Sequence, residues 1–298
     1  MLAPSSDAPR TTLIGISCGI AAAACWAASF VAARHGVQHG LAPADLVLYR
    51  FVPPGLALLP FMIRDGFFGL GGVTWRRGIV LAILGGPAQA LAAYTGFMLV
   101  PLGHGVVIQP ACAVLGGMIL AAWLLNDKLS RTRLLGAMVM IAGLALFAGE
   151  AIATIGKHGI LGDLFFVLAG SLWALFGIAL KSWSLSGPRA ATAVSVVALV
   201  VYTPIHALVF GYGNILTTPL SYNLLQILIQ GLLAAALPIY LFTRALILLG
   251  ASRGATFTAL VPCFALVIGA LTIGEFPTAT QLVGLVVVLV GFRFAVKA

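Results

Sequence analysis

The chain has 298 residues, of which 61% are hydrophobic and 8% are charged, and its mean hydropathy is +1.13. A water-soluble globular domain carries about 25% charged residues, so this composition excludes that class. The formal net charge is +9, but the basic residues gather at the ends of apolar stretches, which argues against a nucleic-acid-binding face.

Long uncharged stretches predict ten membrane-spanning helices, because about 20 apolar residues cross a bilayer. In chain order the predicted spans are 12–33, 43–63, 77–99, 104–126, 132–149, 160–182, 190–211, 222–248, 252–273 and 278–297. The first span continues directly from a short N-terminal segment, so it is predicted to be a transmembrane helix and not a cleaved signal. Ten spans use most of the chain and leave no room for a soluble catalytic domain.

The basic residues also predict the orientation of the spans. With a cytoplasmic N-terminus, thirteen of the sixteen Lys and Arg residues fall on the cytoplasmic side, and the other three are Arg34, Arg50 and Lys157. This bias follows the positive-inside rule and predicts that both termini are cytoplasmic.

The sequence repeats itself at a spacing close to half its length. At offsets of 147 and 148, Trp26–Arg34 aligns with Trp173–Lys181, Asn126–Lys128 with Gly274–Phe276, Leu135-Gly136 with Val283-Gly284, and Gly143 with Gly291. A repeat of this length indicates a duplicated unit. Each unit, 1–150 and 151–298, holds five spans. Because five is odd, the second unit is predicted to be inverted in the membrane.

Glycine and proline residues interrupt corresponding spans of the two units. The third span has Gly85-Gly86-Pro87 and the eighth has Pro238, while Pro53-Pro54, Pro204, Pro110 and Pro262 fall in other spans. A backbone carbonyl freed by a proline at membrane depth must face protein or a water-lined cavity. The breaks in the third and eighth spans therefore predict a central cavity, whereas those elsewhere are explained equally well by packing.

These residues resemble the drug/metabolite transporter superfamily, specifically its EamA-type ten-helix exporters. The matching features are Trp26 to Arg34 in the first span, Arg50 in the second, and Pro262 followed by Gly274-Glu275, Gly284 and Gly291. The first unit carries a weaker copy, Asn126-Asp127 with Gly136 and Gly143, and has Val114 in place of the proline. The resemblance implies a basket of helices 1–4 and 6–9 around a substrate cavity, with helices 5 and 10 at the periphery. It also implies export of amino acids, metabolites or drugs across the bacterial inner membrane, and the chain is similar to aromatic amino-acid exporters of this superfamily.

Polar and aromatic residues inside the spans are the candidate substrate-binding residues, because polar groups in a bilayer are costly. They are Trp26, Arg50, Gln89, Tyr94, Gln109, Trp173, Gln230, Tyr240 and Thr258. Arg50 could attract a substrate carboxylate, extend outward to the membrane surface, or pair with Asp45 in the first turn of the same helix. The tryptophans could form apolar walls, and the amides and phenols could hold polar groups of a substrate or bond neighbouring helices.

The remaining reactive residues predict no catalytic or metal centre. His206 and His104 are more readily explained as structural residues than as proton relays. Cys18, Cys25, Cys112 and Cys263 lie inside spans and form no C-x-x-C pair. The segment Gly250–Gly254 matches G-x-S-x-G but falls between two membrane helices, where we expect a tight turn and not a nucleophile elbow.

The sequence thus predicts an all-α integral membrane protein with ten transmembrane helices in two inverted five-helix repeats around a central cavity. We expect a transporter of small amphipathic metabolites, above all amino acids including aromatic ones, working by alternating access without a cofactor or metal. Its expected partners are a small-molecule substrate and the lipid bilayer but no nucleic acid, and a monomer is compatible with this organisation. A multidrug carrier, a nucleotide-sugar-like carrier and an intramembrane enzyme are the alternatives.

Overall fold

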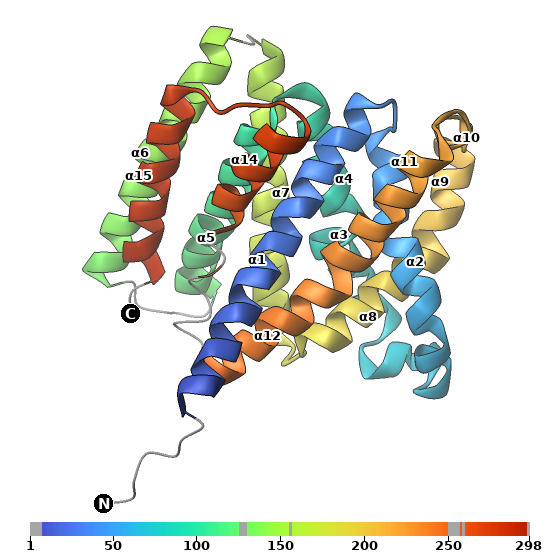
Figure 1. The fold of residues 1–298 in the computed structure, drawn as a ribbon. Helices are drawn as coiled ribbons and strands as arrows, with labels where there is room; N and C mark the ends of the chain where they lie inside the picture. Colours follow the sequence, from blue (N-terminus) through green and yellow to red (C-terminus); the bar gives the residue numbers. More distant parts are fainter. Residues whose placement is uncertain (1–7, 125–129, 155–156, 250–256, 258–259, 297–298) are drawn as a thin grey trace, which may run out of the picture.

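The structure is a computed structural model that describes residues 8–124, 130–154, 157–249, 257 and 260–296. Within these ranges the regular structure is helical throughout (Figure 1). The first half contains α1 (Ala8–Gln38), α2 (Pro43–Arg64), η1 (Phe67–Gly72), α3 (Trp75–Gly85), α4 (Pro87–Leu99), α5 (Leu102–Leu124) and α6 (Arg131–Thr154).

The second half contains more helical segments because two of its spans include wide helical turns. It comprises α7 (Lys157–Ser182), α8 (Gly187–Val197), η2 (Ala198–Tyr202), α9 (Thr203–Val209), α10 (Gly213–Thr217), α11 (Leu220–Gln226), η3 (Ile227–Ala236), α12 (Leu237–Leu249), α14 (Leu260–Thr272) and α15 (Ala279–Val296). The described segments α3 with α4, α8 with η2 and α9, and α11 with η3 and α12 each form one span.

The ten predicted spans are therefore each represented by a span in the described part of the chain. Six of them are long and apolar enough to cross a membrane by length and composition. The beginning of the predicted span 252–273 lies outside the described residues, which resume at Leu260. The first turn of α1 and the last turn of α15 lie toward the same end of the bundle (Figure 1).

The helices pack with an internal two-fold symmetry. α1 packs against α12 and α14, and its repeat counterpart α7 packs against α4 and α5, the counterparts of those two helices. Likewise, α2 packs on η3 as α8 packs on α3. The repeat counterparts α1 and α7 run through the bundle in opposite directions (Figure 1). The predicted inverted repeat is therefore confirmed.

The helices α6 and α15 show this symmetry at the level of single residues. A Cβ atom added to Gly143 would lie 2.9 Å from the Val288 nitrogen and 3.0 Å from the Gly284 oxygen. A Cβ atom added to Gly291 would lie 2.6 Å from the Met140 nitrogen and 2.7 Å from the Gly136 oxygen. The repeat relates the two contacts, because Gly136, Met140 and Gly143 of α6 correspond to Gly284, Val288 and Gly291 of α15. Glycine has no side chain, so the backbones of the two helices can approach closely.

We expect Gly291→Ala to lower the free energy of unfolding by about 1–3 kcal/mol, because the new methyl group would overlap backbone atoms of α6. The matched control is Gly177→Ala, at a position where an added Cβ atom meets nothing within 4 Å. Thermal unfolding of both variants in detergent measures the difference. Equal midpoints for the two variants would contradict close backbone packing at this seam.

Gly86 and two prolines explain the irregular helix geometry. Gly86 separates α3 from α4 with φ −122° and ψ −135°, and a Cβ atom there would lie 2.6 Å from the Ala82 oxygen. Pro204 and Pro238 leave their spans continuous, but the residue four before each lies in a π-helical segment, η2 or η3. A wider turn relieves the clash between a proline ring and the carbonyl of residue i−4.

Candidate functional site

A cavity of 260 Å³ lies among α1, α2, α4, α5, α6, α7, α14 and α15, so it is bounded by both repeats. The expectation that helices 5 and 10 lie at the periphery of the cavity is wrong, because α6 and α15 form part of its wall. Most of its surface is apolar, with walls formed by Trp26 and Phe30 on α1, Trp173 on α7, and Val288 and Phe292 on α15. Such a cavity suits the apolar part of a small molecule, while a few polar groups can fix its orientation.

The polar side of the cavity is organised around Arg50. Its Nη1 donates to the Tyr94 hydroxyl at 3.2 Å and to Oε1 of Gln230 at 3.5 Å. The Tyr94 hydroxyl donates to the same Gln230 oxygen at 2.8 Å, and Nε2 of Gln230 donates to the Ser29 carbonyl at 2.9 Å. Tyr94 and Gln230 are buried, so this chain of bonds positions the guanidinium from α4, η3 and α1 together.

The charge of Arg50 is not balanced by an ion pair with any carboxylate in the described part of the chain. Asp45, one of the two partners considered from the sequence, instead contacts Nε2 of His206 at 2.9 Å and accepts from the Ala42 nitrogen at 2.9 Å. Arg50 therefore does not pair with Asp45, and its side chain lines the cavity and bonds Tyr94. A cavity-lining guanidinium with neutral neighbours attracts an anion.

Gln109 offers a hydrogen-bond acceptor, which complements the donors of Arg50. It lines the cavity next to Pro110 on α5, and among the described residues nothing donates to its buried Oε1 atom. Because a buried acceptor without a donor is costly, this oxygen is suited to accept a hydrogen bond from a bound molecule.

The structure brings most of the candidate residues together. Trp26, Arg50, Gln89, Tyr94, Gln109 and Trp173 line the cavity. Gln230 lies behind Arg50 and Tyr94 as their hydrogen-bond partner. Tyr240 is not brought to the cavity: its side chain is on the outer surface, with the residue 63% exposed. Thr258 and the segment Gly250–Gly254 lie outside the described residues.

Several lining residues were not singled out from the sequence. Ser29 contributes its backbone carbonyl to the Gln230 amide, while Phe30 and Met140 contribute apolar wall. Only their place relative to Trp26 and the repeat could have suggested them. Pro110 and Pro262, whose role the sequence left undecided, both line the cavity.

Two buried histidine–aspartate pairs lie away from the cavity lining. Besides the His206–Asp45 pair, Nδ1 of His104 on α5 contacts Oδ1 of Asp163 on α7 at 2.9 Å. Each pair joins two helices, in agreement with the structural interpretation of both histidines.

The described residues contain no group of three or more His, Cys, Asp or Glu side chains arranged to hold a metal ion.

Comparison with known proteins adds to this geometry. The EamA-like transporter family matches the chain twice, at residues 13–149 and 160–296. The Uncharacterized transporter YdfC of Bacillus subtilis (strain 168) is 27% identical over 289 residues, which cover 90% of this chain and 86% of YdfC. A solved crystal structure with 15% sequence identity superposes with a TM-score of 0.62 and covers 96% of each chain, which supports the fold alone.

Proposed function

The chain belongs to the EamA-like transporter family of the drug/metabolite transporter superfamily, and from this premise we propose that it exports amino acids with large apolar side chains by alternating access. The observation that carries the proposal is a cavity between the repeats with apolar walls, in which no described carboxylate pairs with the Arg50 guanidinium and no described residue donates to Oε1 of Gln109.

The polar groups fit the two charged ends of an amino acid. Arg50 would bind the α-carboxylate, because a guanidinium presents parallel donors to a carboxylate. Oε1 of Gln109 would accept a hydrogen bond from the α-ammonium group. Trp26 and Trp173 would contact the side chain, which favours an aromatic or large aliphatic group.

The inverted symmetry supports alternating access as the mechanism. In carriers built from inverted repeats, one structural unit rocks against the other around a site near the midplane. We propose that the units 1–150 and 151–298 act in this way in the bacterial inner membrane, with both termini in the cytoplasm, as the charge bias predicts.

Purified protein in liposomes tests the proposal. We expect saturable uptake of radiolabelled phenylalanine or tryptophan that is stimulated by unlabelled substrate on the opposite side. Amines that lack the carboxylate should compete at least tenfold more weakly, because they cannot engage Arg50. Absence of transport across a broad amino-acid panel, together with transport of a nucleotide sugar or a cationic drug, would reject this substrate class but keep the carrier.

A further inference from the structure

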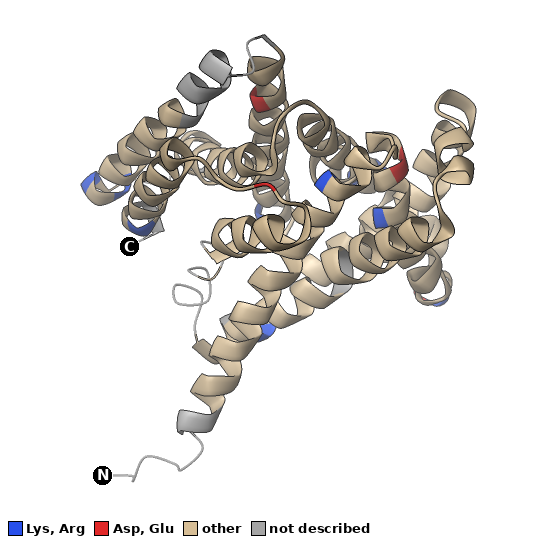
Figure 2. Cartoon of the chain, turned by 45° about the horizontal axis from the view of Figure 1, so that its top comes forward, with Lys and Arg blue, Asp and Glu red and all other residues tan. Residues whose placement is uncertain are grey.

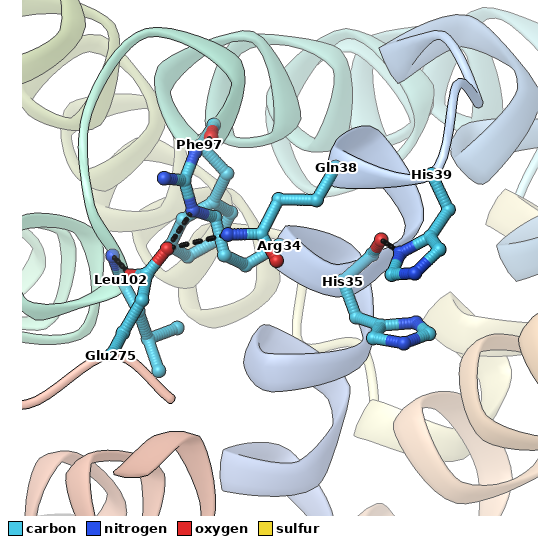
Figure 3. A network of polar contacts seen from close by, with 7 residues as sticks. All are labelled: Arg34, His35, Gln38, His39, Phe97, Leu102 and Glu275. Carbon is cyan, nitrogen blue, oxygen red and sulfur yellow. Dashed lines mark hydrogen bonds and ion pairs between the residues drawn. The ribbon is translucent and has the colours of Figure 1, made fainter. Parts of the chain in front are cut away.

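A polar network joins both repeats at one end of the cavity. Glu275, between α14 and α15, forms an ion pair with Arg34 of α1 at 2.5 Å through its Oε1 atom. The same oxygen accepts from Nε2 of Gln38 at 2.7 Å, and Oε2 accepts from the Leu102 nitrogen at 2.7 Å. Arg34 also donates to the Phe97 carbonyl at 2.5 Å. Figure 3 shows this convergence, with His35 and His39 on the far side of α1.

The network lies one helical turn beyond the cavity on three helices. On α1 the cavity-lining Phe30 is followed four residues later by Arg34, and on α4 Ala93 is followed by Phe97. On α5, which runs in the opposite direction, Leu102 precedes the cavity-lining Val106 by four residues. Four residues of α-helix rise about 6 Å. The polar network therefore lies directly beyond the cavity lining at this end.

Aromatic rings fill the space between the cavity and the network. Phe97 is fully buried; its ring centroid lies 5.7 Å from that of Phe30 and 4.9 Å from that of Phe166 on α7, both with edge-to-face geometry. Because Phe30 also lines the cavity, a solute moving toward this end would have to displace the rings. The aromatic layer is held in turn by the bond from Arg34 to the Phe97 backbone.

The Arg34–Glu275 pair differs from an ordinary surface ion pair. Its side chains are 16% and 18% exposed, whereas those of the Arg64–Asp65 pair are 76% and 57% exposed. A mostly buried, multiply hydrogen-bonded pair is screened less by salt than an exposed one, and removal of one partner leaves the other charge buried and uncompensated. The repeat counterpart of Arg34, Lys181, is exposed, so the two ends of the bundle are not equivalent in this conformation. Charged residues are otherwise sparse along the helices (Figure 2).

We propose that Arg34 and Glu275 form an outer gate, which holds the cavity closed toward the exterior and must separate for substrate release. The proposal goes beyond the proposed function, because a gate is required whatever the solute. It uses the predicted orientation, in which Arg34 lies on the non-cytoplasmic side. Glu275 is the central residue, since it binds donors from α1 and α5 at once.

Thiol labelling tests the gate without any substrate. The four native cysteines are replaced by alanine, and Ala113, a cavity-lining residue of α5, is replaced by cysteine. A membrane-impermeant methanethiosulfonate reagent is then applied to right-side-out and to inverted membrane vesicles. In this background we expect Glu275→Gln to accelerate labelling from outside about tenfold, because loss of a charged acceptor weakens three bonds at once. The matched control, Asp65→Asn, removes the exposed acid of the other ion pair and should leave labelling unchanged.

A reversible cross-link provides the second measurement. Gln38→Cys with Glu275→Cys, in the chain otherwise free of cysteine, places thiols at two positions whose wild-type side chains touch through their tips. Because a cysteine side chain is shorter and a direct disulfide requires Cα atoms within about 7 Å, a bifunctional methanethiosulfonate reagent is used to bridge the two thiols. Cross-linking should stop counterflow transport, and reduction should restore it. Unchanged outside labelling of a folded Glu275→Gln protein, or full transport with the cross-link formed, would overturn the gate. If Glu275→Gln accelerated thiol labelling only in inverted vesicles, the network would lie on the cytoplasmic side and its assignment as an outer gate would be wrong. A labelling response in protein that transports no amino acid would reject the proposed substrate and keep the gate.

Discussion

Replacing Arg50 by methionine should raise the KM for amino-acid transport by about a hundredfold. The guanidinium lines the cavity, and the described carboxylates form no ion pair with it. Hydrogen bonds to charged groups contribute about 1.5–3 kcal/mol, and each 1.4 kcal/mol is tenfold in affinity. Methionine keeps an unbranched apolar stem of similar length, so the change removes the charge and its donors while disturbing the walls little. Uptake kinetics in liposomes measure the effect.

Arg64→Met is the matched control, because Arg64 is also on α2 but its side chain is 76% exposed. It should leave KM unchanged. Arg50→Lys should give an intermediate KM, since an ammonium keeps the charge but lacks the planar pair of donors. If Arg50→Met transported amino acids with wild-type KM, the carboxylate would be bound elsewhere and the assignment of Arg50 would be wrong.

The second large effect is expected on stability. Asp45→Ala should lower the free energy of unfolding by about 2–4 kcal/mol, because it removes the carboxylate that contacts the buried His206 ring and accepts the Ala42 N–H. Asp45 is 2% exposed and His206 is fully buried, and the carboxylate also accepts the Ala42 N–H in the first turn of α2. Thermal unfolding in detergent measures the stability of the variant. Transport by the folded fraction after reconstitution in liposomes measures its function separately.

Two further variants sharpen this prediction. Asp45→Asn keeps an acceptor for the Ala42 N–H and should cost less than Asp45→Ala. Asp65→Ala removes an acid whose side chain is 57% exposed, and exposed pairs contribute about 0–1 kcal/mol. Equal unfolding midpoints for Asp45→Ala and Asp65→Ala would show that the His206–Asp45 contact does not stabilise the fold.

The fold could be predicted because its signals are periodic and redundant. Apolar length located the spans, and the repeat supplied their relative orientation, which the packing of Gly143 and Gly291 confirms. The geometry around Pro238 could not be read in the same way. A proline removes one backbone hydrogen bond whether the chain responds with a sharp break, as at Gly86, or with a widened helix, as in η3.

The sequence predicts several of the residues that line the candidate site, but it does not predict which side chains bond to one another. Arg50 and Gln109 were found because polar groups are rare in these spans, but which acid faces Arg50 depends on helix rotation. Asp45 is close to Arg50 in sequence, yet it is bonded to His206, more than 150 residues away. Tyr240 was a candidate because it is a polar aromatic residue inside a span, but it is exposed on the outer surface of the bundle. The Arg34–Glu275 contact spans 241 positions, and no local pattern indicates such a pair.

The seam between α6 and α15 has a consequence for the history of the molecule. Its two glycine contacts are equivalent by rotation, so the surface on one helix is complementary to the copy of itself on the other. A self-complementary surface is what two identical subunits use when they associate about a two-fold axis. An unduplicated five-helix ancestor bearing Gly136 and Gly143 would therefore already have carried the means to dimerise in antiparallel orientation, and gene fusion would have preserved that contact inside one polypeptide.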